Sequence, residues 1–145
     1  MAIKKFGTAH WAGDLQSGKG RVSTESTALD NTPYGFNTRF EDEPGSNPEE
    51  LVGAAHAACY SMALSMILGQ HDATADAIDT KATVSLEKDG DGFSVTKVHL
   101  EVKATVPGLD EAKFMEAANA AKEGCPISKL YKGGTAEITM DASLV

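Results

Sequence analysis

Basic residues are scarce in this sequence. It has 13 lysines and arginines against 21 aspartates and glutamates, which gives a formal net charge of −8, and the basic residues are scattered along the chain. A nucleic-acid-binding protein needs a basic face to contact phosphates, so this composition argues against a nucleic-acid partner. Internal repeats, low-complexity tracts and linkers are also missing, and 145 residues fit one globular unit. We therefore expect a single domain over residues 1–145.

The N-terminus lacks the apolar stretch of a signal peptide. Its first residues, MAIKKFGTAHW, are basic and then alternate in polarity. We therefore expect a cytoplasmic protein, and structural disulfides are rare in that compartment. The one long apolar run, residues 51–68, is interrupted by polar side chains and is rich in alanine rather than leucine. This composition favours a helix buried in protein over a membrane span.

Cysteine is almost absent, and the sequence contains no CxxC motif. The two cysteines are Cys59, within GAAHAACYSM, and Cys125, within GCPIS. His56 lies one helical turn from Cys59, so a metal site formed by these two residues and Cys125 is conceivable. Zinc sites usually present a fuller ligand pattern, and we expect neither a metal nor another cofactor. Taken alone, a cysteine in an apolar helix is typical of inert packing.

The pattern of polar and apolar residues predicts an α+β fold. Asn47, Pro48 and two glutamates are typical of a helix start, and Gly69 is expected to end that helix. An antiparallel sheet is expected to pack on this long central helix. The predicted elements are strands at 3–11, 20–26 and 32–40, a helix at 48–68, a hairpin at 79–106, a helix at 111–124 after the cap Asp110, a short helix from Pro126, and a strand at 135–144.

The helix over residues 48–68 is apolar on every side. A surface helix keeps a polar stripe, and one sheet covers only one side of a helix. We therefore expect a second copy of the chain to cover the remainder, in a homodimer.

The two cysteines are expected to differ in electrostatics. Cys125 precedes Pro126 at a helix start, where the helix N-terminus stabilises a thiolate. Cys59 lies in mid-helix among apolar residues, which favour the neutral thiol. A reactive Cys59 therefore requires a cation from another part of the chain.

Several stretches resemble the OsmC branch of the OsmC/Ohr family over essentially the whole chain. They are HWAGD, GKGRVSTES, PYGFNTRFE, NPEELVGAAHAACYSMALS and GCPIS. The resemblance implies a cytoplasmic, thiol-dependent peroxidase for organic hydroperoxides that is associated with osmotic and oxidative stress. It also implies an intertwined α+β homodimer with active sites at the subunit interface.

The resemblance assigns roles to four residues. Cys59 matches the peroxidatic cysteine, Cys125 the resolving cysteine, Arg39 the arginine that stabilises the thiolate, and Glu49 the glutamate that holds this arginine. The implied cycle forms a sulfenic acid on Cys59 and then a disulfide with Cys125, which an external dithiol reduces. Glu49 and Cys59 are ten residues apart on one predicted helix, roughly 15 Å along its axis, so we expect Glu49 to come from the partner subunit.

Other interpretations of these residues stay open. Arg39 is compatible with a solvated surface charge, Glu49 with a helix N-terminus, Cys125 with a simple cap and His56 with a hydrogen-bonded core histidine. The whole protein is also compatible with a redox sensor or binding protein that uses the same disulfide without efficient turnover. A metal-binding module and a structural dimer are the remaining alternatives.

Overall fold

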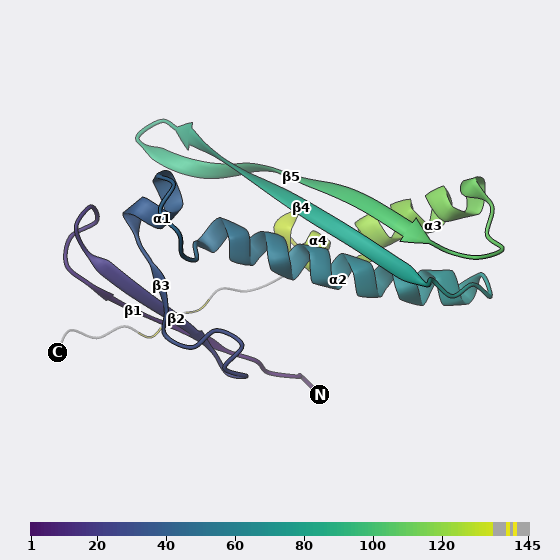
Figure 1. The fold of residues 1–145 in the computed structure, drawn as a ribbon, viewed down its shortest axis with the longest axis horizontal. Coiled ribbons are helices and arrows are strands. Elements are labelled where there is room, and N and C mark those ends of the chain that lie inside the picture. Colours follow the sequence, from purple (N-terminus) through teal and green to yellow (C-terminus); the bar gives the residue numbers. More distant parts are fainter. Residues whose placement is uncertain (135–138, 140, 142–145) are drawn as a thin grey trace. The chain divides into compact units, whose positions relative to one another are not determined.

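The computed structural model describes residues 1–134, 139 and 141. Within these residues the chain forms five β-strands, in two separate sheets, and four helices (Figure 1). The elements are β1 (Gly7–Ala12), β2 (Lys19–Thr24), β3 (Thr32–Tyr34), α1 (Phe36–Phe40), α2 (Pro48–Gln70), β4 (Ala77–Asp89), β5 (Gly92–Thr105), α3 (Glu111–Gly124) and α4 (Pro126–Tyr131). This order confirms the α+β class, whereas the strand predicted at 135–144 lies outside the described residues apart from positions 139 and 141.

The chain divides into two compact units. The first comprises Met1–Val52 and Val84–Val95, and the second comprises Gly53–Thr83 and the chain from Thr96 onward. The helix α2 and the hairpin β4–β5 each have residues in both units. The single domain over 1–145 stays a prediction.

The first sheet has the antiparallel order β1-β2-β3. Gly20 pairs with Trp11 on one side and Tyr34 on the other, and the two rings lie 5.6 Å apart. A Cβ at Gly20 would come within 2.8 Å of both rings, so only glycine lets them close over this strand. The two aromatic residues of the family-like stretches therefore have a packing role.

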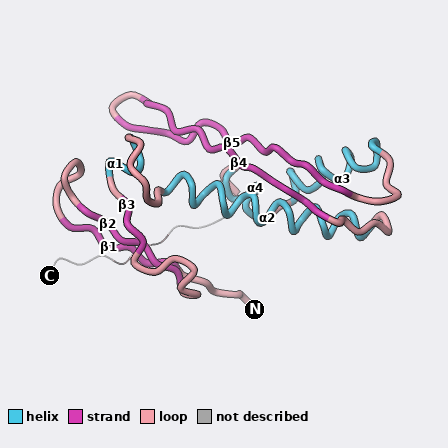
Figure 2. Tube along the Cα trace, viewed as in Figure 1, coloured by secondary structure: helices cyan, strands magenta, loops and turns pink. Residues whose placement is uncertain are grey.

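The segment 32–40 is extended only over its first three residues. The strand predicted for the whole segment is wrong after Tyr34, because α1 follows directly (Figure 2). Thr38 closes this helical turn: its hydroxyl accepts from the Gly35 N–H at 2.9 Å and donates to the Gly35 carbonyl at 3.0 Å. Phe36 and Phe40 are four residues apart, a helical spacing, and their rings meet at 4.8 Å.

The start of α2 confirms the predicted cap. Asn47 Oδ1 accepts from the Glu50 N–H at 2.9 Å, and Asn47 Nδ2 donates to the Thr38 carbonyl at 3.1 Å. The predicted end is too early, because Gly69 is still helical and the helix closes at Gln70. The left-handed residue after the helix is Asp72, at φ +55°.

The core of the second unit lies between α2 and α3. Tyr60, Leu64 and Leu68 of α2 are buried against Ala117 and Ala121 of α3, and Ile78, Leu100 and Val102 of the hairpin pack against this cluster. The small alanines let the two helices approach closely. This packing confirms that the hairpin lies on the long helix.

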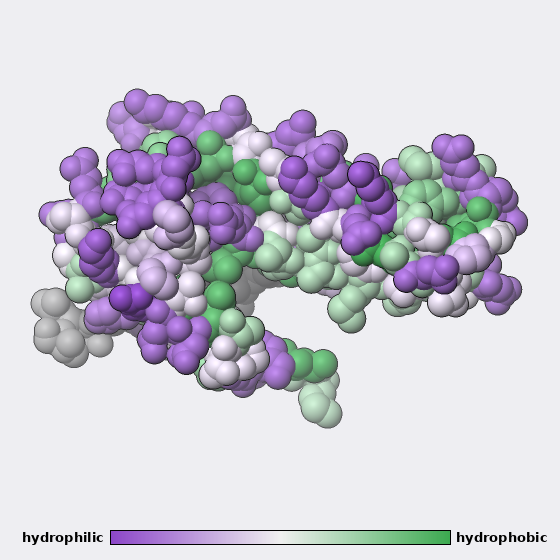
Figure 3. Space-filling model, in the orientation of Figure 1, coloured by the Kyte–Doolittle hydropathy of each residue, from purple (hydrophilic) through white to green (hydrophobic). Residues whose placement is uncertain are grey.

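The opposite side of α2 is apolar and exposed. Ala54, Ala58, Met62 and Met66 share this side, and the two methionines are 76% and 64% exposed. In length and hydropathy α2 also meets the criteria for a membrane-spanning helix, and 28% of its apolar window is buried within the chain. The start of the chain is hydrophobic and exposed as well, the green projection at the N-terminal end in Figure 3.

Candidate active site

The fold brings the two cysteines into contact. Cys59 lies in the middle of α2, and Cys125 both ends α3 and begins α4. Their sulfurs are 2.9 Å apart, and both cysteines are reduced. Cys125 is completely buried, whereas Cys59 is partly exposed. A reagent from solvent therefore reaches Cys59 first.

The two thiols have opposite electrostatics. Burial raises the pKa of Cys59 and its hydrogen bond with Cys125 raises it further, which outweighs the N–H of Ile127. Burial also acts to raise the pKa of Cys125. This effect is outweighed by interactions with the Cys59 side chain, with the N–H groups of Ser128 and Ile127 and with the Ser128 hydroxyl, so the pKa of Cys125 is lowered. These directions agree with the expectation that the helix start favours a Cys125 thiolate.

A buried polar group lies beside the cysteines. His56 Nε2 is 2.7 Å from Ser128 Oγ, and both residues are only 6% exposed. The Tyr131 ring meets the imidazole edge-on, with 5.2 Å between ring centroids. Sequence reasoning did not identify Ser128 or Tyr131 as neighbours of His56, because more than seventy residues separate them from it.

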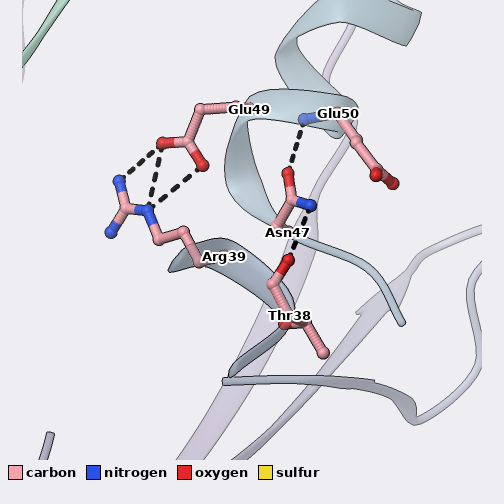
Figure 4. A network of polar contacts seen from close by, with 5 residues as sticks. All are labelled: Thr38, Arg39, Asn47, Glu49 and Glu50. Atoms are coloured by element: carbon pink, nitrogen blue, oxygen red, sulfur yellow. Dashed lines mark hydrogen bonds and ion pairs between the residues drawn. The ribbon is translucent and has the colours of Figure 1, made fainter. Parts of the chain in front are cut away.

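Arg39 and Glu49 form a hydrogen-bonded ion pair (Figure 4). Arg39 Nε donates to both carboxylate oxygens at 3.1 Å, and Nη2 donates to Oε1 at 2.6 Å. Nη1 points away from Glu49 in the close-up, and within the described residues no hydrogen bond is recorded for it. The guanidinium is therefore oriented by one acceptor and retains donors for a second.

The surroundings of this ion pair restrict its motion. Asn47 joins the end of α1 to the start of α2 through the two hydrogen bonds in Figure 4, so Arg39 and Glu49 are carried on linked backbone. The guanidinium carbon lies 5.3 Å from the centre of the Phe40 ring, which itself contacts Phe93 at 5.0 Å. A cation over an aromatic face gains further stabilisation.

The four predicted site residues therefore form two pairs. Arg39 and Glu49 belong to the first compact unit, and Cys59 and Cys125 belong to the second. Among the described residues, no three His, Cys, Asp or Glu side chains are grouped as a metal-binding set.

Comparison with known proteins identifies the family. The model of the OsmC-like protein family matches residues 40–140. The chain belongs to this family. It is 56% identical to peroxiredoxin OsmC of Escherichia coli K12 over 144 residues, which cover 99% of both chains. The resemblance to the OsmC branch is thus confirmed.

An Ohr relative is more distant in sequence and similar in fold. The organic hydroperoxide resistance protein OhrB of Bacillus subtilis is 33% identical over 116 residues, which cover 79% of this chain and 82% of OhrB. Its crystal structure superposes with a TM-score of 0.64 at 30% identity, covering 88% of this chain and 91% of the OhrB chain. The predicted OsmC-like fold is confirmed by this similarity.

Proposed function

We propose that this protein is a thiol-dependent peroxidase that reduces organic hydroperoxides to alcohols. The observation that carries the proposal is the contact between Cys59 and Cys125, two reduced thiols 2.9 Å apart although 66 positions separate them in the sequence. Membership of a family that includes a protein named peroxiredoxin OsmC supports the same activity, as does similarity to an organic hydroperoxide resistance protein.

The first step is attack of the Cys59 thiolate on the distal peroxide oxygen. The O–O bond breaks, the alcohol leaves after its oxygen takes up a proton, and Cys59 becomes a sulfenic acid. Cys59 suits this role because it is the partly exposed cysteine of the pair. The apolar alanines and methionines of α2 favour a peroxide with a hydrocarbon body over a fully hydrated one.

The second step is attack of Cys125 on the Cys59 sulfur, which gives a disulfide and water. The buried position of Cys125 protects it from direct oxidation, and its contact with Cys59 makes the attack intramolecular. An external dithiol then reduces the disulfide by thiol–disulfide exchange.

Arg39 supplies the cation that Cys59 lacks. Burial raises the pKa of Cys59, so a charged donor is needed to stabilise its thiolate. Arg39 is one of two arginines in the sequence, and Glu49 orients its guanidinium while other donors stay free for the sulfur and the peroxide oxygen.

We infer that the Arg39–Glu49 pair acts on Cys59 of a partner subunit in a homodimer. Glu49 and Cys59 belong to one unbroken helix, in which ten residues rise about 15 Å along the axis. The exposed apolar side of α2 needs a cover, and we propose that a second copy of the chain supplies it. We prefer a second copy to a membrane because we expect a cytoplasmic protein, and the net charge is −8.

A redox sensor is the second candidate function, because the same Cys59–Cys125 contact would serve one oxidation event. Steady-state consumption of a cumene-type hydroperoxide separates the two. With a dithiol reductant we expect many equivalents of peroxide to be reduced per subunit, and faster reduction of organic hydroperoxide than of hydrogen peroxide. Consumption that stops after one equivalent, with the dithiol still present, would contradict the peroxidase and favour the sensor.

A further inference from the structure

The mechanism above leaves a buried polar pair unused. His56 on α2 and Ser128 on α4 are each 6% exposed and are hydrogen-bonded at 2.7 Å. His56 lies about one helical turn before Cys59, and Ser128 lies about one turn after Cys125. Buried polar groups cost free energy unless they are paired, so a serine and a histidine retained at this position need an explanation.

The position of the imidazole proton follows from burial. His56 Nδ1 is buried and has no hydrogen-bond partner within the described part of the chain. An orphaned buried N–H is rarer in proteins than an under-satisfied acceptor, so the proton of the neutral ring belongs on Nε2, where Ser128 Oγ accepts it. Burial also lowers the pKa of His56, which favours the neutral ring.

This arrangement fixes the direction of the Ser128 hydroxyl. Because Oγ accepts from His56, its own proton is free to be donated elsewhere. The Ser128 hydroxyl is also among the groups that lower the pKa of Cys125. Ser128 lies three positions after Cys125 at the start of α4, a spacing that puts both side chains on one side of the helix. Tyr131, edge-on to the imidazole, keeps the ring in place.

We propose that His56 and Ser128 are positioning residues for Cys125, in a chain of donors from His56 Nε2–H to Ser128 Oγ–H to the Cys125 sulfur. The proposal rests on the proposed peroxidase function for its consequence, because this chain holds Cys125 as a thiolate for the second step. In that step the Cys125 thiolate forms an S–S bond with Cys59, the S–O bond of the sulfenic acid breaks, and the leaving hydroxide takes a proton from solvent to become water.

The first test measures the Cys125 thiolate without any peroxide. In a Cys59→Ala background, ultraviolet absorbance of the thiolate is followed against pH, with Ser128→Ala added. A hydrogen bond to a charged sulfur is strong enough that we expect the thiolate fraction at neutral pH to fall about tenfold. Ser128→Thr, which keeps the hydroxyl, is expected to restore it. In the part of the chain that the structure describes, Tyr131 on α4 interacts electrostatically with Cys125, and His56 on α2 is bonded to Ser128, so both are followed in the same titration.

Ser61→Ala is the matched control. Ser61 is also a hydrogen-bonded serine of the second unit, but its hydroxyl bonds to the Ala57 carbonyl and to Thr80. Its removal is expected to leave the Cys125 titration unchanged.

The second test measures disulfide formation in a single turnover. Reduced protein with both cysteines is mixed with one equivalent of organic hydroperoxide, and the loss of thiols is separated into Cys59 oxidation and disulfide formation. We expect Ser128→Ala and His56→Leu to slow disulfide formation about tenfold, and His56→Gln, whose amide N–H can replace Nε2–H, to recover most of the rate.

An unchanged Cys125 titration in Ser128→Ala, with a lower unfolding midpoint, would overturn the proposal and leave Ser128 a packing role. A His56→Gln variant as slow as His56→Leu would overturn the part assigned to His56. The absorbance titration needs no peroxide, so it tests the donor chain even if the protein proves not to be a peroxidase. Ser128→Ala with its Ser128→Thr partner decides the case if His56→Leu fails to fold.

Discussion

The middle of α2 and the start of α4 each carry a cysteine, and the two sulfurs lie 2.9 Å apart. The two regions nevertheless shift the pKa of a thiol in opposite directions. On α2, apolar surroundings raise the pKa of Cys59, and on α4, the backbone N–H groups and Ser128 lower the pKa of Cys125. The cysteine that its own helix favours as a thiolate is the buried one. In the proposed mechanism the accessible cysteine depends on the cation of Arg39, so accessibility and activation would come from different parts of the molecule.

Cys59→Ser is expected to have the largest effect, a complete loss of turnover. A serine hydroxyl is not ionised near neutral pH and is a poor nucleophile toward a peroxide. Steady-state consumption of organic hydroperoxide with a dithiol measures the loss, and circular dichroism checks that the fold is retained. Substantial turnover by this variant would assign the first attack to the α4 sulfur instead.

Cys125→Ser is expected to permit one oxidation event per subunit and to abolish the disulfide. The sulfenic acid then persists on Cys59, because the intramolecular thiol is gone. Intact-protein mass spectrometry after one equivalent of peroxide, with a sulfenic-acid trapping reagent, measures the product. An unmodified Cys59 would reverse the roles given to the two regions.

Arg39→Ala is expected to lower the second-order rate of Cys59 oxidation about a hundredfold. Removal of one charged hydrogen-bond donor from a reacting group typically lowers a rate by about this factor. Alkylation of Cys59 against pH should show a higher thiol pKa in the variant. Arg39→Lys is the matched control and should retain part of the rate, because it keeps the charge and loses the planar fork. An unchanged alkylation profile would remove Arg39 as the activator.

Mixing Cys59→Ser with Arg39→Ala subunits tests the origin of the cation. If Arg39 serves the Cys59 of its partner, each mixed dimer has one intact site, and random exchange recovers about a quarter of the wild-type activity. The measurement is turnover after subunit exchange, with each variant alone as control. If activity does not recover although mixed dimers form, Arg39 acts within its own subunit.

The smallest expected effect concerns the histidine that joins the two regions. Burial lowers the pKa of His56, so below the ordinary histidine pKa the unfolded chain binds a proton that the folded chain does not. Stability therefore falls as the pH falls from about 7 to about 5, and His56→Gln should remove part of this slope. Urea unfolding midpoints at the two pH values measure it, and equal slopes in both proteins would contradict a neutral, buried His56.

Helix and hairpin boundaries were predictable where the local chemistry is decisive. Asn47 caps α2, Asp110 caps α3 by accepting from the Lys113 N–H, and Cys125 with Pro126 starts α4 as expected. Each of these signals involves residues within one helical turn. Both partners of the interaction are therefore close together in the sequence and can be identified from it.

The conformation around Arg39 was not predicted, because aromatic and threonine residues in 32–40 favour a strand by propensity alone. The spacing of Phe36 and Phe40 was the available helical signal, and Thr38 decides the outcome by bonding to Gly35. The contact of Ser128 with His56 had no local signal, since it depends on how α4 packs against α2.

Cys125 is at once the last cap of α3 and the first cap of α4, so its sulfur marks a joint between two helices. Oxidation would link this junction covalently to the middle of α2 through a disulfide and would close a loop between two cysteines that are 66 positions apart. In the chain-entropy model such a loop adds about 4 kcal/mol to the free energy of unfolding. Each catalytic cycle would then alternate between a more stable disulfide form and a less stable dithiol form. A thermal unfolding curve would distinguish the two redox states.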